Sequence, residues 1–449
     1  MQALGGLSSV SLLPKAKAFS EKRMRVGCIG VGGKGRSDLE QLARHAEVVA
    51  MCDIDQKKLD YAHRSFPSAR KFNDYRKMIA QCGEALDIVS VSTPDHTHAH
   101  AAQLALNSGI HLFVQAPMAH TVWELRQISK LAQKKGLCTQ VGMHGCAHDN
   151  FRNAVEYIRG GGIGEIREIH AWMNRTDWQK APEIKERPQE APPIPASLNW
   201  EAFLGPAGKR PFHPAYQPYQ WRGWRDFGTG VLGNDGVHLL NLAAMGCQLG
   251  TPSKVKCLLK APFHRETFSA WGTVCFDFLP RLQKGKVQLF WYEGRVGNLS
   301  RQLKGTPNLP GKPLFLGKSP SPQGCIIVGS KGSFHTSSRY GTDWEVNYGN
   351  GWIPSGNLDL PFPSMPRNGR GDSGMKEELV RAIRTNLPQI ALANFEYAAE
   401  FTEWLLLGNI ALSIGGEFDW DRENFSTNRS EANALLSKDY RNGWRVYAV

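Results

Sequence analysis

Several features that would assign this chain to a simple class are missing from its sequence. No apolar run reaches the ~18 residues of a membrane-spanning helix, so no span is expected. The nine cysteines include no Cys-x-x-Cys pair, which argues against a zinc site or a disulfide framework. The net charge is +13, but the basic residues are scattered, so nucleic-acid binding is not expected.

Length and pattern together predict two domains. The chain has 449 residues, more than one ordinary hydrophobic core accommodates. Short apolar strands alternate with helical segments from residue 24 to about 143, which is typical of a doubly wound parallel sheet. After residue 149 strands follow one another with few helices between them, which favours an open, largely antiparallel sheet. We therefore expect an α/β domain at 24–146 and an α+β domain at 147–449.

The most informative motif follows the first predicted strand. Apolar residues 24–29 run straight into Gly30-x-Gly32-x-x-Gly35. In this spacing the first glycine permits a tight turn, the second lets the backbone approach a pyrophosphate, and the third lets a helix pack on the strand. Asp53 ends the next strand, where an acid hydrogen-bonds the ribose 2′-hydroxyl of NAD and repels the phosphate of NADP. The pattern predicts an NAD site that includes Gly30, Gly32, Gly33, Gly35 and Asp53.

Longer motifs make the chain resemble one oxidoreductase family. They are the glycine loop with Asp53, Ser92-Thr93-Pro94-Asp95-His96-Thr97-His98, the strand before Pro117, Asn174-Arg175 with Trp178, Leu204-Gly205-Pro206, and Trp221-Arg222-Gly223-Trp224-x-x-Phe227-Gly228-x-Gly230. With these motifs the sequence resembles the Gfo/Idh/MocA family of glucose-fructose oxidoreductase and inositol dehydrogenase from Met24 to about Ile414. The later motifs are similar to a branch rich in planctomycete and verrucomicrobial sequences, which are often exported.

The resemblance implies a fold and a role for many residues. It implies a Rossmann domain and an α+β domain, with the nicotinamide between them and a sugar or polyol on the open sheet. The implied cofactor contacts are Ser92, Thr93, Pro94, His96, His98, Gln115 and Pro117. The candidate substrate contacts are Asn174, Arg175, Trp178, Trp221, Arg222 and Trp224, although each tryptophan suits a hydrophobic core equally well. Thr97 is expected to cap a helix, and the alternating histidines around it do not converge on a metal.

The chain departs from the family pattern at the positions that handle protons. Where Glu-Lys-Pro is usual it has Gln115-Ala116-Pro117, so the lysine position is Ala116. Where Gly-Asp-x-Gly-x-His is usual, the histidine is kept as His238 but the aspartate position is Asn234. The adjacent Asp235 would point roughly 100° away if this stretch is helical. We expect His238 to handle the proton, with Asn234 and Asp235 as its neighbours in the catalytic set.

A further departure adds a histidine. After the sixth predicted strand the chain reads Gly142-Met143-His144, where Gly-Asn-Gln is usual. One hypothesis is that His144 partly replaces the missing lysine. Another, equally favoured by the sequence, is that His144 only hydrogen-bonds backbone in a cleft wall.

Three functions fit this pattern. The first is an NAD-dependent oxidoreductase acting on a sugar, polyol or sugar derivative, with a nicotinamide that is tightly bound. The alternative is a redox-neutral glycosidase that oxidises, eliminates and reduces again, as some members without the lysine do. The third is a catalytically impaired sugar-binding relative. The expected partners are a small carbohydrate and, by the resemblance, further copies of the chain in a dimer or tetramer.

The first residues differ from the rest. A small-residue apolar run at 3–13 precedes Ala16-Lys17-Ala18, which has the form of a signal-peptidase site. Residues 1–23 are therefore expected to be an export-signal remnant, similar to the end of a twin-arginine signal, or a disordered arm. The protein is expected to be periplasmic or exported, and cytoplasmic if that interpretation is wrong; its unpaired cysteines fit export poorly.

Overall fold

The first domain is a doubly wound parallel sheet. The structure is a computed structural model that describes residues 23–174, 186–281, 285–297, 305–360, 363–368 and 370–449. Six parallel strands lie in the order β3-β2-β1-β4-β5-β6, which reverses direction between β1 and β4. The strands are β1 (Met24–Ile29), β2 (Ala46–Cys52), β3 (Arg70–Phe72), β4 (Ile88–Val91), β5 (His111–Val114) and β6 (Thr139–Val141). In such sheets ligands bind at the carboxyl ends of the strands beside the reversal.

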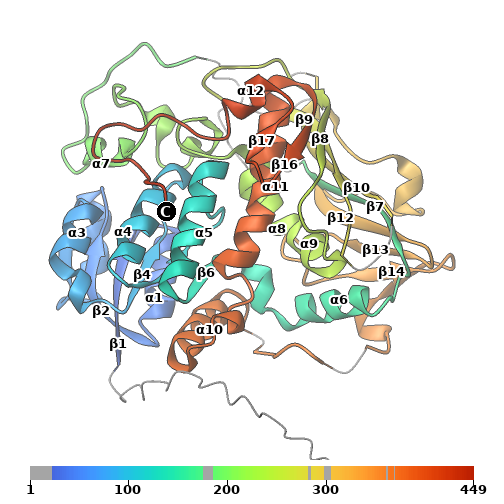
Figure 1. The fold of residues 1–449 in the computed structure, drawn as a ribbon, viewed down its shortest axis with the longest axis horizontal. Coiled ribbons are helices and arrows are strands. Elements are labelled where there is room, and N and C mark those ends of the chain that lie inside the picture. The colour runs from blue at the N-terminus through green and yellow to red at the C-terminus, as the bar shows by residue number, and fades with distance from the viewer. Residues whose placement is uncertain (1–22, 175–185, 282–284, 298–304, 361–362, 369) are drawn as a thin grey trace, which may run out of the picture.

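Five helices cover this sheet (Figure 1). They are α1 (Lys34–Leu42), α2 (Gln56–His63), α3 (Tyr75–Cys82), α4 (Asp95–Asn107) and α5 (Val122–Lys135). Helix α5 begins with a complete capping box formed by Thr121 and Glu124, and it ends at Gly136 in the left-handed region. Helix α4 begins two residues before the predicted cap: Pro94 is its N-cap, and Thr97 lies in the first turn and donates to the Pro94 carbonyl. The prediction that Thr97 caps this helix was therefore wrong.

The second domain contains an eleven-stranded, mostly antiparallel sheet. Its order is β15-β14-β13-β12-β7-β10-β9-β8-β16-β17, with β11 paired to β10, and β7 and β10 form a parallel pair. The strands are β7 (Ile166–Met173), β8 (Lys254–Lys260), β9 (Trp271–Phe278), β10 (Val287–Val296), β11 (Thr306–Pro307), β12 (Gln323–Gly329), β13 (Ser333–Thr336), β14 (Glu345–Asn347), β15 (Trp352–Pro354), β16 (Gly416–Asp421) and β17 (Ser426–Thr427).

The helices of this half join the two domains as well as covering the sheet. They are α6 (Asp149–Arg159), α7 (Trp200–Leu204), α8 (Val237–Leu239), α9 (Asn241–Cys247), α10 (Gly371–Thr385), α11 (Phe395–Ile414) and α12 (Ser430–Asn433). Helix α10 returns to pack on α1, and α11 packs between α5 and the second sheet. The C-terminus ends beside α4 and α5 (Figure 1), where Tyr447 and Gln103 exchange two hydrogen bonds of 2.7 and 2.8 Å. Segments late in the chain therefore complete the wall of the first domain.

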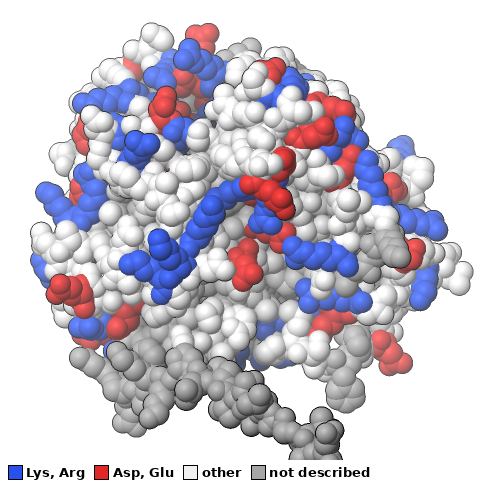
Figure 2. Space-filling view, in the orientation of Figure 1, with Lys and Arg blue, Asp and Glu red and all other residues white. Residues whose placement is uncertain are grey.

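The charged side chains on the surface are mixed in sign, and the cysteines form no disulfide bonds. Figure 2 shows basic and acidic side chains interspersed with uncharged ones over one face of the molecule. All nine cysteines are free thiols, and eight of them are buried. In the described part of the chain, no helix has the length and apolar character needed to cross a bilayer. Residues 1–22, on which the export prediction rests, lie outside the described part.

Candidate active site

A cavity of about 430 Å³ lies between the two domains, where β1 and β4 end. Its first-domain wall includes Gly30, Gly32, Gly33, Lys34, Asp53, Lys58, Ser92, Thr93, Pro94, Asp95, Gln115, Ala116 and His144. Its second-domain wall includes Ala202, Phe203, Gln217, Pro218, Tyr219, Trp221, Arg222, Asn234, His238, Arg339 and Tyr340. The cavity thus joins the predicted cofactor loop to the predicted proton-handling residues.

The glycine loop has no room for side chains at two of its positions. A Cβ on Gly30, whose φ is +81°, would lie 2.4 Å from the Ser92 carbonyl oxygen at the end of β4. A Cβ on Gly35 would lie 2.1 Å from the Gly30 carbonyl oxygen. These contacts hold the turn against β4 and bring the start of α1 close to β1. Backbone N–H groups at a helix start favour anions, so this end of the cavity fits a pyrophosphate.

Asp53 lies at the same end and is tied to the glycine loop. One carboxylate oxygen accepts from the Val31 N–H at 2.9 Å, and the other accepts from the Asp55 N–H at 3.0 Å. Burial raises the pKa of Asp53, and these two hydrogen bonds partly offset that rise. Each oxygen keeps a lone pair for a further donor, so the carboxylate fits a ribose hydroxyl.

The second domain covers this end of the cavity. The Gln56 N–H donates to the Ser197 carbonyl and the Asn199 N–H donates to the Ile54 carbonyl, both at 2.8 Å. Asp55 and Leu198 form an antiparallel bridge between these bonds. The chain beyond this bridge contributes Phe203 and the segment 217–222 to the cavity wall. Two backbone hydrogen bonds, which form this bridge, therefore fasten the cover to the loop that follows Asp53.

Three aromatic rings with proton-bearing groups meet at the opposite end. The centroid of His144 lies 5.4 Å from that of His238 and 5.3 Å from that of Tyr340, and the His238 and Tyr340 centroids are 5.1 Å apart. Burial lowers the pKa of His144 to about 4 and the pKa of His238 well below its ordinary value. Both imidazoles are therefore neutral at pH 7 and can accept a proton.

A buried carboxyl group lies in the wall of the same cavity. Asp95 begins α4, is 1% exposed, and accepts a 2.7 Å hydrogen bond from the Thr229 hydroxyl of the second domain. Burial raises its pKa to about 7, although Thr229 and the nearby Arg222 favour the charged form. Its pKa near neutrality makes Asp95 a candidate proton donor or acceptor. The sequence motif contained Asp95, but only its burial identifies it.

The structure brings many of the predicted residues to this cavity. Among them, Gly30, Gly32, Gly33, Asp53, Ser92, Thr93, Pro94, Gln115, His144, Trp221, Arg222, Asn234 and His238 line it. Asp235 is fully buried behind the wall and pairs with Arg339 at 2.7 Å, on a π-helical turn at Leu232–Gly236. Its carboxylate therefore holds Arg339 rather than facing the cavity. Sequence reasoning did not single out Arg339 and Tyr340, which follow β13.

Other predicted residues lie behind the wall and support it. The ring nitrogens of His96 bind the carbonyls of Phe203 and Phe227, and those of His98 bind the carbonyls of Pro117 and Thr93. These bonds position the β4 loop, whereas the predicted direct contacts of both histidines with a cofactor find no support in the lining. Four other predicted residues are also absent from the lining: Gly35, Pro117, Trp224 and Asn174, the last of which bonds the Asn308 carbonyl in the second domain. Arg175 and Trp178 lie outside the described residues.

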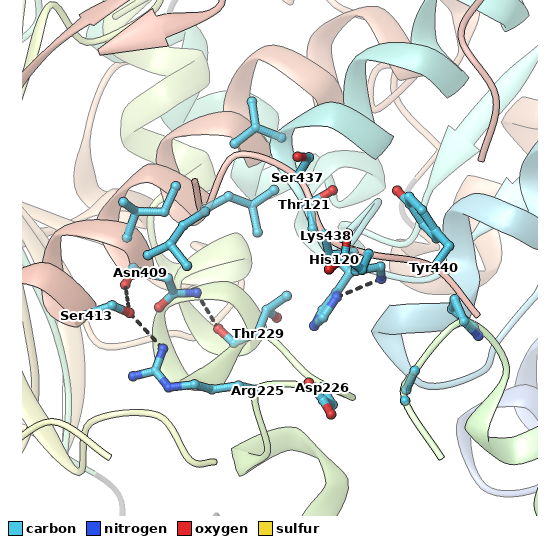
Figure 3. Close-up of a pocket in the computed structure, with 18 of the residues that line it drawn as sticks. His120, Thr121, Arg225, Asp226, Thr229, Asn409, Ser413, Ser437, Lys438 and Tyr440 are labelled. Carbon is cyan, nitrogen blue, oxygen red and sulfur yellow. Dashed lines mark hydrogen bonds between the residues drawn. The ribbon is translucent and has the colours of Figure 1, made fainter. Parts of the chain in front are cut away.

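A second, larger cavity of about 710 Å³ has Thr229 in its lining (Figure 3). Several of its polar groups are already bonded to one another or to the wall. Lys438 binds His120 at 2.9 Å and Glu124 at 2.8 Å, and Arg225 binds Ser413 at 2.7 Å. None of the predicted site residues lines this cavity. The described residues also contain no group of three or more side chains suited to a metal ion.

Comparisons with known proteins agree with this geometry. A family model, GFO_IDH_MocA, described as "Oxidoreductase family, NAD-binding Rossmann fold", matches residues 24–143. A second model of that family, its "C-terminal alpha/beta domain", matches residues 147–287. The two matches together span more than half of the chain.

Curated relatives align over about a third of the chain. A "1-carboxy-3-chloro-3,4-dihydroxycyclo hexa-1,5-diene dehydrogenase" of Comamonas testosteroni is 32% identical over 166 residues, which are 36% of this chain and 41% of that protein. A "Glycosyl hydrolase family 109 protein" of Shewanella baltica is 33% identical over 174 residues, which are 35% of this chain and 36% of that protein. The chain thus matches less than half of the length of these relatives.

A solved structure extends the likeness to nearly the whole chain. An inositol dehydrogenase homolog from Azotobacter vinelandii, complexed with NADH and myo-inositol, superposes with a TM-score of 0.61 at 15% identity. The superposition covers 89% of this chain and 98% of the homolog, and at this identity it shows a shared fold. Together the two family models, the fold and the glycine loop show that the chain belongs to the Gfo/Idh/MocA family of oxidoreductases, with an NAD-binding Rossmann domain.

Proposed function

We propose that the protein is an NAD-dependent oxidoreductase that acts on a hydroxyl group of a sugar, polyol or sugar derivative and keeps its cofactor bound. The observation that carries this proposal is the single cavity, which has the glycine loop and Asp53 at one end and three proton-bearing rings at the other. Neither end alone would support the chemistry. A cofactor held at one end needs a group at the other that takes the alcohol proton.

The residues present fit the cofactor. Gly30 and Gly35 leave no space for a Cβ, Gly32 presents backbone to the cavity, and Asp53 keeps free lone pairs. These residues, with Ser92 and Thr93, would hold NAD, which supplies the acceptor or donor of the hydride when bound.

The chain's own part in the reaction is to orient the sugar and move a proton. Trp221 offers an aromatic face to ring C–H groups, and Arg222 offers donors to hydroxyl oxygens. His238 lines the cavity and is neutral, so its imidazole is suited to accept the alcohol proton. His144 and the Tyr340 hydroxyl stand beside it and can pass that proton on.

Retention of the cofactor is supported by the cover over the Asp53 end. Release from that end would require the two backbone hydrogen bonds that form the bridge between Asp55 and Leu198 to break. Such a step makes exchange slow relative to an open cleft. We propose export as well, because a retained cofactor would let the protein act where no free NAD pool exists.

Redox-neutral cleavage of a glycoside is the second candidate. It is favoured by Ala116 in the usual lysine position together with several proton-transfer groups in one cavity, and by the likeness to the Shewanella protein. In this chemistry the carbon that bears a sugar hydroxyl would lose a hydride and the hydroxyl its proton, the carbon beside the new carbonyl would lose a proton, and the glycosidic oxygen would leave with one. Water then adds its hydroxyl to the vacated carbon and its proton to the neighbouring carbon, and the carbonyl regains a hydride and a proton, so the net reaction is hydrolysis.

One series of measurements separates these functions. The purified protein is denatured and the released nucleotide is quantified by chromatography; NAD close to one per chain supports retention. Reduction of added NAD by a panel of sugars and polyols supports the oxidoreductase. Release of an aryl group from aryl glycosides without added cofactor supports the glycosidase. Bound NAD with neither activity contradicts both and favours the impaired relative, whereas the absence of any NAD binding overturns the whole proposal.

A further inference from the structure

Four charged side chains form a network beside His144; Asp38 and Lys376 are buried, whereas Lys34 and Asp372 are partly exposed. Lys34 lies at the start of α1 and contacts Asp38 at 2.6 Å and Asp372 at 2.7 Å. Lys376 on α10 contacts the same carboxylates at 2.7 and 2.5 Å. Each lysine thus bridges both aspartates, so two cations and two anions close a ring between α1 and α10.

This network holds one carboxylate against His144. The Asp372 Oδ1 lies 3.4 Å from the His144 Nε2, at ion-pair distance, and that nitrogen has no hydrogen-bond partner among the described residues. Helix α10 packs directly against the turn at His144–Ala147. Arg152 fixes that turn from the other side by donating to the Cys146 carbonyl at 2.8 Å. Both members of the His144–Asp372 contact are therefore held by their surroundings.

We propose that Asp372 is a positioning residue for His144, which selects the tautomer with the proton on Nε2. The ring's other nitrogen, Nδ1, is then left with a lone pair and becomes the acceptor for a proton. A base that is oriented by a third group through its far nitrogen is the general arrangement of catalytic histidines. This inference rests on the proposed function only in giving that acceptor a substrate; the tautomer itself is a property of the resting protein.

The network gives Asp372 the charge that this role needs. Burial alone would raise the pKa of Asp372, but His144, Lys376 and Lys34 lower it far below its ordinary value. Lys376 is fully buried, so its charge is compensated by Asp38, by Asp372 and by the face of Phe113 at 4.4 Å. Lys376 of α10 thus keeps the Asp372 carboxylate charged beside His144. The lysine that is usual in the family is absent here, because its position is Ala116.

The alternative is that the network only fastens α10 to α1 and has no effect on His144. The two possibilities differ in what they predict for the tautomer and the pKa of the His144 ring. If Asp372 positions His144, the tautomer and the proton affinity of that ring depend on the carboxylate. If it does not, Asp372→Asn changes stability while the ring keeps its properties.

The decisive measurement is nuclear magnetic resonance on the full chain with isotope-labelled histidine. The His144 signal is identified by its loss in His144→Gln. We expect the Nε2–H tautomer in the wild-type protein, and the Nδ1–H tautomer there would overturn the proposal even if Asp372→Asn does not fold. In Asp372→Asn we expect a mixture of tautomers and a fall in the His144 pKa of about one unit or more, because an opposite charge is lost.

The groups that face His144 set the sign of that shift. Asp372 and Asp38 raise its pKa, whereas Lys34 and Lys376 lower it, and His238 and Tyr340 are its neighbours in the cavity. Removing the carboxylate charge removes the largest raising effect. An unchanged pKa and tautomer in a folded Asp372→Asn protein would contradict the inference.

Turnover gives a second test once a substrate is known. Asp372→Asn should lower kcat about 10- to 100-fold with little change in KM, since only the base is affected. Asp372→Glu keeps the charge and should recover part of the loss. Glu377→Gln is the matched control, because Glu377 lies on the same helix but pairs with the exposed Arg370. If no substrate is found, the proposed function fails while the tautomer measurement still decides the role of Asp372.

Discussion

Replacing Gly32 by alanine separates binding of the cofactor from stability of the fold. The three atoms nearest to a Cβ on Gly32 all belong to the Lys58 side chain: Cδ at 2.5 Å, Cε at 3.2 Å and Cγ at 3.3 Å. A lysine side chain can move, so the apoprotein should lose no more than about 1 kcal/mol of stability. The new methyl group nevertheless occupies the path by which a pyrophosphate approaches the backbone.

The expected effect on NAD follows from that difference. We expect Gly32→Ala to weaken NAD binding about 10- to 100-fold, or about 1.4 to 2.8 kcal/mol. Gly30→Ala should lower both stability and binding, because its Cβ would lie 2.4 Å from a backbone oxygen and its φ is +81°. Titration calorimetry on nucleotide-free protein measures the affinity, and urea unfolding of the same samples measures the stability.

Two controls make the comparison strict. Gly208→Ala is a neutral reference, since nothing lies within 4 Å of that Cβ. Gly32→Ala in a Lys58→Ala background shows whether displacement of Lys58, rather than loss of backbone approach, weakens the binding. The argument for the glycine loop is refuted if Gly32→Ala binds NAD as tightly as the wild-type chain, or if its loss disappears in the Lys58→Ala background.

Three further outcomes are expected. Asp53→Asn should lower the free energy of unfolding of the cofactor-free protein by about 1–3 kcal/mol, because an amide can accept from only one of the two backbone N–H groups that Asp53 binds. Urea unfolding checks this value. Titration of the same variant with NAD and with NADP should show weaker discrimination against NADP. The folded pKa of Asp95 is about 7, above the unfolded value of ~3.9, so the folded state binds the extra proton and stability should fall as pH rises through this window, by about 4 kcal/mol at most. Asp95→Asn should flatten that slope in melting curves between pH 5 and 8, and an unchanged slope would contradict the assignment. Thr121→Ala should remove half of the capping box of α5 and cost about 1 kcal/mol of unfolding free energy, with little effect on NAD binding.

The first domain could be predicted well because its signals are local. The glycine loop needs only the strand before it and the helix after it, and Asp53 needs only the end of β2. Parallel strands buried on both faces are apolar runs that the sequence displays directly. The cavity-lining positions of Gly30 and Asp53 follow from these elements alone.

The other end of the cavity could be predicted only in part. The family resemblance pointed to His144 and His238, but nothing in the sequence pointed to Tyr340 or Asp372, which come from distant segments. His144, His238 and Tyr340 follow β6, the π-helical turn and β13, and they meet only when the second sheet has formed. Asp372 lies still further along the chain and approaches His144 because α10 returns to the first domain. No spacing rule links these positions. The raised pKa of Asp95 likewise depends on burial by the second domain rather than on its motif.

The distribution of charge explains how this site differs from its family's usual pattern. A lysine at position 116 would place a cation in the cavity wall, where it could steady a developing alkoxide. Here the corresponding wall position is apolar, and the rings of His144 and His238 beside it are neutral. A fully buried cation, Lys376, lies behind the wall and is compensated by two carboxylates. The cavity wall still carries the cations Lys34, Lys58, Arg222 and Arg339, but none at position 116, where the family has its lysine. The Asp372 carboxylate beside His144 is then the group that directs a neutral imidazole toward accepting a proton.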